Sequence, residues 1–76
     1  DRKPAPMPDD PNDWPVVDVF IPSYNEPLDV VRPTVFAALA MDYPADKLRV
    51  HLLDDGRRED FRRFAAEVGC NYVIPP

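Results

Sequence analysis

Two short polar segments of the 76-residue chain carry residue types that could bind a ligand, and each follows an apolar run. The candidate binding residues are Ser23, Tyr24, Asn25, Glu26, Asp54, Asp55 and Gly56. A tyrosine ring offers a flat face on which a base can stack, while serine, asparagine and aspartate can hydrogen-bond a base or a ribose. This combination is typical of a site that reads a nucleoside.

The same residues also have structural interpretations. Ser23 and Asn25 could simply form a turn, and Glu26 could interact with the positive end of a helix dipole. Asp54 and Asp55 could act as a helix N-cap and a turn former. Both interpretations stay open for each residue taken alone, but the occurrence of two such segments after two strands favours a binding site.

Two common phosphate-binding patterns are missing from the sequence. No GxGxxG follows the first apolar run, and no GxxxxGK[ST] occurs anywhere. The sequence therefore predicts neither a dinucleotide fingerprint nor a P-loop. We assign no catalytic residue and no metal ligand within the chain, and we expect His51, which lies inside the second apolar run, to be a packed or edge residue.

The first strand and helix must position the first polar segment. A β-branched and aromatic run, Val16 to Ile21, predicts a strand that is buried on both faces and ends at Pro22. Apolar residues at helical spacing predict a helix from Leu28 to Met41. Pro33 lies inside this helix, so we expect either a kink or a regular part that begins near Arg32.

The second half of the chain repeats the order of strand and helix. Leu48 to Leu53 predicts a second strand, and Gly56 is able to adopt a positive φ where it ends. A second amphipathic helix follows and ends at Gly69. Its charged face, which includes Arg58, is expected to be solvated unless Arg57 or Arg58 touches phosphate or a neighbouring segment. A short third strand is predicted from Tyr72 to Ile74.

The resulting order is that of an α/β protein with a Rossmann-like half-sheet (β-α-β-α-β), in which right-handed crossovers join parallel strands. Ligands of open α/β sheets bind beyond the carboxyl ends of the strands. Because both polar segments follow strands, we expect them to meet at one sheet edge. The sequence thus predicts one nucleoside site within a single domain over residues 16–76.

Composition sets residues 1–15 apart from this domain. Several of the chain's 11 prolines lie there among charged residues, with little apolar surface to pack, which predicts a proline-rich connector. The net charge of −5 argues against a surface that binds nucleic acid, which relies on clustered Lys and Arg. No apolar run approaches the roughly 20 residues that cross a bilayer, so we expect these residues themselves to be soluble.

Taken together, the segments "YNEPLDVVRPT", "DYP", "LLDDGRR" and "FRRFA" closely resemble the start of the catalytic domain of bacterial cellulose synthases, which are processive family-two glycosyltransferases. The resemblance runs from about Trp14 to Ile74. It implies the N-terminal, nucleotide-binding portion of a GT-A domain that transfers glucose from UDP-glucose to a growing β-1,4-glucan acceptor. It also implies that Tyr24 lies against uracil and that Asp54 and Asp55 hold the uridine.

Other parts of such an enzyme would lie outside these residues. The resemblance implies a DxD metal motif for a magnesium ion, a TED motif with the catalytic base, a QxxRW motif, transmembrane helices, a cyclic-di-GMP-binding PilZ domain and a periplasmic partner subunit. It places the parent protein at the cytoplasmic face of the bacterial inner membrane. We therefore expect the 76 residues to be inactive alone.

Two alternatives stay open at this point. One is another family-two polysaccharide synthase, because the residues that face the sugar would lie downstream. The other is a receiver-like signalling module that binds magnesium through an acidic pair at a strand end. The second alternative needs an aspartate at the end of the third strand, where "YVIPP" has proline instead.

Overall fold

The computed structural model describes residues 9–76 of the chain. The elements along it are η1 Pro11–Asp13, β1 Val17–Ser23, α1 Leu28–Leu39, η2 Ala45–Lys47, β2 Leu48–Asp54, α2 Glu59–Val68 and β3 Asn71–Val73. Strands and helices alternate as the sequence predicts, although β3 begins one residue earlier and ends one residue earlier than expected. The α/β half-sheet is confirmed.

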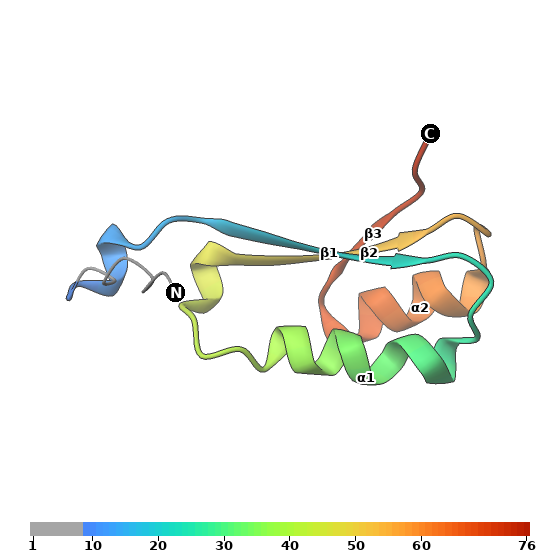
Figure 1. The fold of residues 1–76 in the computed structure, drawn as a ribbon, viewed down its shortest axis with the longest axis horizontal. Coiled ribbons are helices and arrows are strands. Elements are labelled where there is room, and N and C mark those ends of the chain that lie inside the picture. The colour runs from blue at the N-terminus through green and yellow to red at the C-terminus, as the bar shows by residue number, and fades with distance from the viewer. Residues whose placement is uncertain (1–8) are drawn as a thin grey trace, which may run out of the picture.

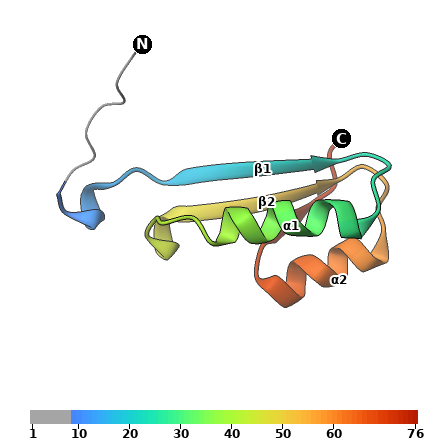
Figure 2. The ribbon, with the colours of Figure 1, turned by 60° about the horizontal axis from the view of Figure 1, so that its bottom comes forward.

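The described strands form one parallel three-stranded sheet in the order β1-β2-β3. The register pairs Val17 with Leu48 at one end of β1 and Ser23 with Asp54 at the other. Both helices lie on the same side of this sheet, as Figures 1 and 2 show. The turns that lead from β1 into α1 and from β2 into α2 therefore lie at one edge of the sheet, and the C-terminal residues lie beside them (Figure 2).

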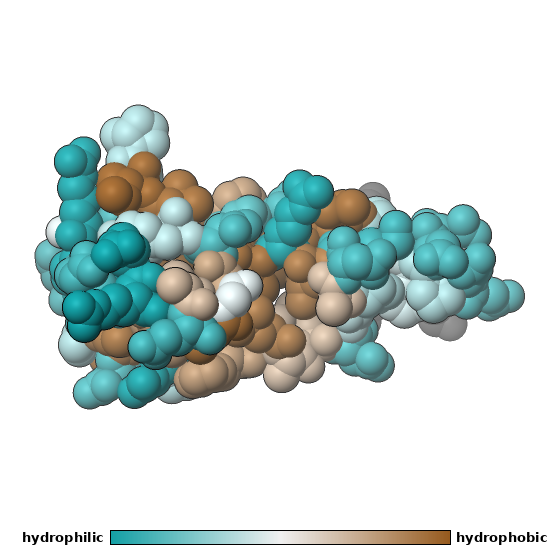
Figure 3. Space-filling view, turned by 180° about the vertical axis from the view of Figure 1, so that it is seen from behind, coloured by the Kyte–Doolittle hydropathy of each residue, from teal (hydrophilic) through white to brown (hydrophobic). Residues whose placement is uncertain are grey.

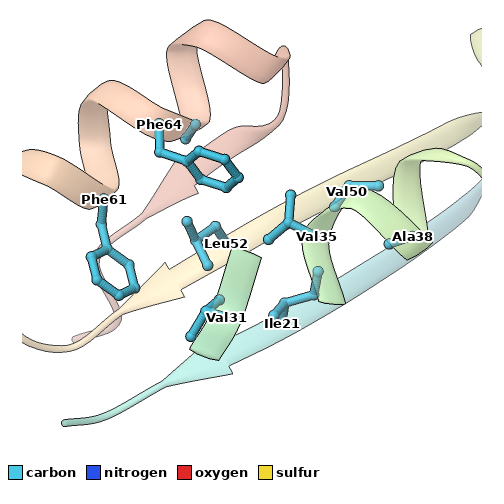
Figure 4. Packing of buried hydrophobic residues seen from close by; sticks show 9 residues of the cluster. Ile21, Val31, Val35, Ala38, Val50, Leu52, Phe61 and Phe64 are labelled. Carbon is cyan, nitrogen blue, oxygen red and sulfur yellow. The ribbon is translucent and has the colours of Figure 1, made fainter. Parts of the chain in front are cut away.

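The core fills the space between the helices and the sheet (Figure 4). Its buried residues are Ile21, Val31, Val35, Ala38, Val50, Leu52, Phe61, Phe64 and Ala65. They come from alternate positions of the strands and from one face of each helix, which is the pattern that the helical spacing predicts. Gly69 ends α2 with a φ of 83°, which is the left-handed backbone conformation expected of a glycine that ends a helix.

Burial of the first strand on both faces is a wrong prediction for this chain. Exposed and less exposed residues alternate along β1, and the side chain of Phe20 is 59% exposed. The reason is that both helices cover the same face, so every second residue of β1 points away from them. Apolar residues also reach the surface in the middle of the molecule, between more polar ends, when it is seen from behind (Figure 3).

The predicted end of the first strand at Pro22 is also wrong, because β1 continues to Ser23. The carbonyl oxygen of Ser23 accepts a hydrogen bond from the Asp55 N–H at 3.4 Å, so Ser23 faces β2. Its neighbour Pro22 then faces the open side of an edge strand, where a missing N–H removes no ladder hydrogen bond.

The first helix begins at Leu28 and runs through Pro33 to Leu39. A regular part that begins only near Arg32 is therefore a wrong prediction. Proline at this position removes the one N–H that would bond to the Asp29 carbonyl. Val31 and Val35, which flank the proline, are buried and hold the helix on the sheet.

Residues 1–8 of the predicted connector lie outside the described residues. In the described part, Pro11–Asp13 forms a short 3-10 helix with no buried residue. The Trp14 ring packs on the Tyr43 ring with centroids 5.2 Å apart. Within residues 9–76, none of the helices is long and apolar enough to cross a membrane.

Candidate nucleoside-binding site

A pocket of about 210 Å³ lies beyond the carboxyl ends of the first two strands. Its lining residues are Pro22, Ser23, Tyr24, Leu53, Asp55, Pro75 and Pro76. Both polar segments contribute to it because Ser23 and Asp54 are register partners at the ends of β1 and β2. The structure thus brings the two segments together at one edge, as the topology predicts.

Tyr24 and Asp55 are the exposed members of the predicted site that line this pocket. The side chain of Tyr24 is 67% exposed, and Asp55 is also exposed at the surface. Both line the same pocket. An accessible ring beside an accessible carboxylate could stack a base and accept hydrogen bonds from its N–H groups or from ribose hydroxyls.

Asp54 has a different environment, because its side chain is completely buried. Its carboxylate accepts hydrogen bonds from Gly56 N at 3.2 Å, Arg58 N at 2.6 Å and the Tyr72 hydroxyl at 2.8 Å. The Arg58 guanidinium completes the set through Nε and NH2 at 3.2 and 3.1 Å. These contacts give Asp54 a structural role, because they shape the turn that leads into α2. A structural role is one of the two interpretations that the sequence leaves open for Asp54.

The hydrogen bonds keep Asp54 ionised. Burial by itself raises the pKa of the Asp54 carboxyl, but bonds from the Arg58 backbone, the Tyr72 hydroxyl, the Arg58 side chain and the Gly56 N–H outweigh it and lower the pKa below its ordinary value. Burial together with the bond to Asp54 and its charge raises the pKa of Tyr72 to about 12. The pair therefore stays a carboxylate and a neutral phenol over the physiological range.

The other predicted residues surround this pair in several ways. Ser23 is buried, and its hydroxyl donates to the Leu53 carbonyl at 3.1 Å, so this hydroxyl already has a partner in the protein. The Glu26 carboxylate accepts from the Tyr24 N–H at 2.7 Å, which stabilises the turn after β1. Its own backbone and the Tyr24 N–H lower the pKa of Glu26. Asn25 is exposed within the same turn.

Gly56 is needed for close approach and not for a left-handed backbone. The expectation of a positive φ at Gly56 is wrong, because Arg57 has that conformation with a φ of 52°. A Cβ at Gly56 would lie 3.2 Å from the Arg58 Nε. The glycine therefore leaves room for the Arg58 side chain to pack against the turn.

The expected solvation of Arg58 is wrong as well. Its side chain is only 28% exposed, and its guanidinium forms an ion pair with Asp54 and stacks over the Phe61 ring at 3.6 Å from the centroid. The stated exception, contact with a neighbouring segment, is what the structure shows. Farther along α2, Arg62 and Arg63 pair with Glu59 on the exposed face, as predicted for a solvated arginine run.

Sequence reasoning missed three residues of this region: Tyr72, Pro75 and Pro76. The parallel topology offered a signal for the two prolines, because the end of a third parallel strand must lie at the same sheet edge. Nothing in the sequence pattern marked the Tyr72 hydroxyl as a partner of Asp54.

His51 lies on the opposite face of the sheet from the helices. Its Nε2 is 2.8 Å from the Asp18 carboxylate, its Nδ1 is 3.2 Å from the Asn71 amide, and its ring stacks on Phe20. The prediction of a packed residue is confirmed.

A second, larger cavity of about 350 Å³ lies between β1 and α1. Its lining is mostly aliphatic and aromatic, with Glu26 and Thr34 as the polar residues. We place the candidate site in the smaller pocket because, of these two cavities, it is the one that combines an accessible aromatic ring with residues from both polar segments. Within residues 9–76, no three His, Cys, Asp or Glu side chains are grouped so that they could hold a metal ion.

The raised pKa of Tyr72 gives a testable alkaline transition. A raised folded-state pKa means that the stabilisation from this phenol is complete below pH of about 10 and is lost as the pH rises toward the folded value. In a full-length synthase that carries this segment, ultraviolet absorbance titration should show a tyrosine step near pH 12 that Tyr72→Phe removes. The Tyr43→Phe variant serves as the matched control and should keep the step. Persistence of the step in Tyr72→Phe would contradict the Asp54–Tyr72 contact.

Fold and site together define a class of protein segment: a parallel α/β half-sheet with a pocket for a small ligand at the carboxyl ends of its strands. Comparison of the sequence with known proteins shows which proteins this segment resembles. The chain is 67% identical over 72 residues to the UDP-forming cellulose synthase catalytic subunit of Xanthomonas axonopodis pv. citri, and 64% identical over 74 residues to cellulose synthase 2 of Novacetimonas hansenii. It is 61% identical over 72 residues to the UDP-forming catalytic subunit of Pseudomonas fluorescens.

These matches cover 95–97% of this chain, whereas the chain spans only 5–10% of the length of these relatives. Nearly all of the 76 residues are thus similar to one segment of cellulose synthases, as the sequence motifs indicate. The chain matches no protein-family model.

Proposed function

We propose that these residues form the donor-nucleotide part of a cellulose synthase, a family-two glycosyltransferase of GT-A fold that transfers glucose from UDP-glucose to a β-1,4-glucan. One observation carries the proposal: Tyr24 and Asp55 line one pocket at the carboxyl edge of a parallel sheet in a chain that resembles UDP-forming synthases. The relatives named UDP-forming release UDP, and for this chain the product UDP is part of the proposal.

In this proposal the two accessible residues read the nucleoside. The Tyr24 ring stacks on the uracil, and the Asp55 carboxylate accepts a hydrogen bond from the imide N–H or from ribose hydroxyls. Leu53, Pro75 and Pro76 form apolar walls that keep water away from the base. Asp54 contributes indirectly, because its carboxylate is fully buried and already accepts hydrogen bonds from Gly56, Arg58 and Tyr72.

The chemistry of sugar transfer needs more than these residues. An inverting transfer requires a base to deprotonate the acceptor hydroxyl, and a divalent cation would stabilise the leaving diphosphate. The described residues do not fit a metal site by themselves. We propose that magnesium ligands and the base lie elsewhere in a longer parent protein, and we assign no step to the ion here.

The remaining features of such a parent are proposals on the same footing. They are membrane attachment at the cytoplasmic face of the inner membrane, a glucan acceptor site, a periplasmic partner subunit and a domain that binds cyclic-di-GMP. The identity of the sugar rests on the resemblance to cellulose synthases, since no residue of the pocket is assigned to it.

Replacing Tyr24 tests the proposed nucleoside site. In a full-length synthase that carries this segment, Tyr24→Ala should raise the Kd for UDP by about 5- to 150-fold, because base–aromatic stacking contributes about 1–3 kcal/mol. Tyr24→Phe keeps the flat ring and should bind UDP nearly as well as the parent. Isothermal titration with UDP measures both variants. Unchanged UDP affinity in Tyr24→Ala would rule out stacking at this position.

A further inference from the structure

Arg58 connects the two turns that supply the candidate site. Its NH1 donates to the Glu26 carbonyl at 2.5 Å, and its NH2 lies 3.4 Å from the Ser23 hydroxyl. Its Nε and NH2 donate to the buried Asp54 carboxylate. One guanidinium thus bonds to the end of β1, to the turn after β1 and to the end of β2.

The contacts continue from Arg58 to the exposed ring. Glu26, whose carbonyl Arg58 holds, accepts the Tyr24 N–H with its own carboxylate at 2.7 Å. In the turn after β2, the Asp54 carboxylate accepts hydrogen bonds from the N–H groups of Gly56 and Arg58. These bonds fix the backbone of the turn that carries Asp55. Arg58 therefore lies between the backbone that carries Tyr24 and the backbone that carries Asp55.

Packing holds the guanidinium in this place. It stacks on Phe61, which is fully buried, while Gly56 leaves room for its Nε. The Asp54 carboxylate that compensates its charge is also fully buried and receives a further hydrogen bond from Tyr72. A side chain with its orientation set by an ion pair and by stacking is suited to positioning its neighbours.

We propose that Arg58 is a positioning residue for nucleotide binding, which fixes Tyr24 and Asp55 relative to each other and does not itself touch the nucleotide. The inference rests on the proposed function, because it assumes that these two residues hold the nucleoside. It assigns to the arginine after "DDGR" a role in setting the width of the base pocket.

Arginine is required for this role by its geometry. The guanidinium presents donors along three directions in one plane, and here Nε, NH1 and NH2 reach acceptors from three segments. A lysine has a single nitrogen and could keep the charge opposite Asp54, but it could not hold the Glu26 carbonyl at the same time. Arg58→Lys therefore separates compensation of charge from positioning.

The test uses a full-length synthase that carries this segment. We expect Arg58→Lys to raise the Kd for UDP by about tenfold, which is the effect of losing about one hydrogen bond that orients the site. The Kd for uridine, which lacks phosphate, should rise by the same factor. The number of binding sites per protein should stay unchanged in titration. The KM for UDP-glucose should rise in parallel while kcat is kept, because stacking of the base contributes equally to substrate and transition state.

Arg62→Lys is the matched control, since Arg62 pairs with Glu59 on the exposed face of the same helix. It should leave both Kd values unchanged. Loss of UDP affinity with unchanged uridine affinity in Arg58→Lys would show that Arg58 contacts phosphate directly and would overturn the proposal. A fall in the number of sites at constant Kd would show a purely structural role and would also overturn it.

The experiment also separates this proposal from the proposed function. If Tyr24→Ala weakens UDP binding but Arg58→Lys does not, the nucleoside site stands and the positioning role of Arg58 is wrong. If neither variant changes UDP binding, the nucleoside site itself is wrong, and the role of Arg58 is overturned with it.

Discussion

Alanine at Asp54 is expected to lower the free energy of local unfolding by about 3–5 kcal/mol, whereas alanine at Asp55 should change it by less than about 0.5 kcal/mol. The difference follows from burial. Asp54 is fully buried and receives hydrogen bonds from Gly56, Arg58 and Tyr72, so its removal leaves donors without an acceptor and a partly buried arginine without its counter-ion. Asp55 is exposed.

For UDP binding, replacing Asp55 should act directly on the nucleotide, whereas replacing Asp54 should act indirectly, through the fold of the turn. Asp55→Ala removes a carboxylate from the pocket and is expected to weaken UDP binding with full retention of folded protein. Asp54→Ala should weaken binding as well, but only together with local unfolding of the turn into α2. Replacement of either aspartate of the "DDG" segment thus weakens UDP binding, but for different reasons.

Hydrogen exchange in a full-length synthase can measure the local free energy at β2 and α2, and isothermal titration can measure UDP affinity in the same variants. Asp54→Asn keeps the shape and one acceptor oxygen, so it should lie between the parent and Asp54→Ala in stability. Equal loss of protection in the alanine variants of Asp54 and Asp55 would contradict the assignment. So would unchanged UDP affinity in both.

The sequence was sufficient to predict the fold because hydrophobic periodicity reflects local geometry. Val31, Val35 and Ala38 repeat with the period of a helix and are buried in α1, and Phe61, Phe64 and Ala65 do the same in α2. Parallel topology then places the ends of β1 and β2 at one edge, whichever residues occupy them. The meeting of the two polar segments could therefore be predicted.

The division of roles inside the site could not be predicted, because it depends on side-chain directions at the strand end. Alternation along β2 turns Asp54 toward the helices and leaves Asp55, in the turn, exposed. Adjacent identical residues carry no sign of this difference in a single sequence. The position of Arg58 is equally hard to predict, since its charge suggested solvent, whereas in the structure it pairs with the Asp54 carboxylate and stacks on the Phe61 ring.

Burial of β1 depends on what covers the sheet, and the sequence of the strand itself does not contain this information. A run such as Val16 to Ile21 is apolar enough for burial on both faces, yet the two crossovers of this chain cover one face only (Figures 1 and 2). Phe20 is consequently exposed in the 76 residues. This geometry underlies the second large effect that we expect.

The 76 residues made alone should be poorly folded or self-associating and should not bind UDP-glucose tightly. Within residues 9–76 the sheet has three strands with β1 and β3 at its edges, and edge strands with free backbone groups pair with other chains. The face of the sheet away from the helices exposes Phe20 and carries the partly exposed Leu53 and Val73. Phe20→Lys should reduce self-association, which analytical ultracentrifugation measures.

Charge opposes tight binding of the donor to the isolated chain. Asp55 and Glu26 are exposed near the pocket, while Arg58 already compensates Asp54 and is not free to bind phosphate. The screening length at physiological salt is about 8 Å, so the exposed carboxylates repel a diphosphate bound in the same crevice. Isothermal titration of monomeric chain with UDP-glucose and magnesium should give no binding in the low-micromolar range. The reason is that the described residues offer no metal site that could offset the two phosphates. Binding in the low-micromolar range would instead show that the segment is a self-sufficient nucleotide-sugar module.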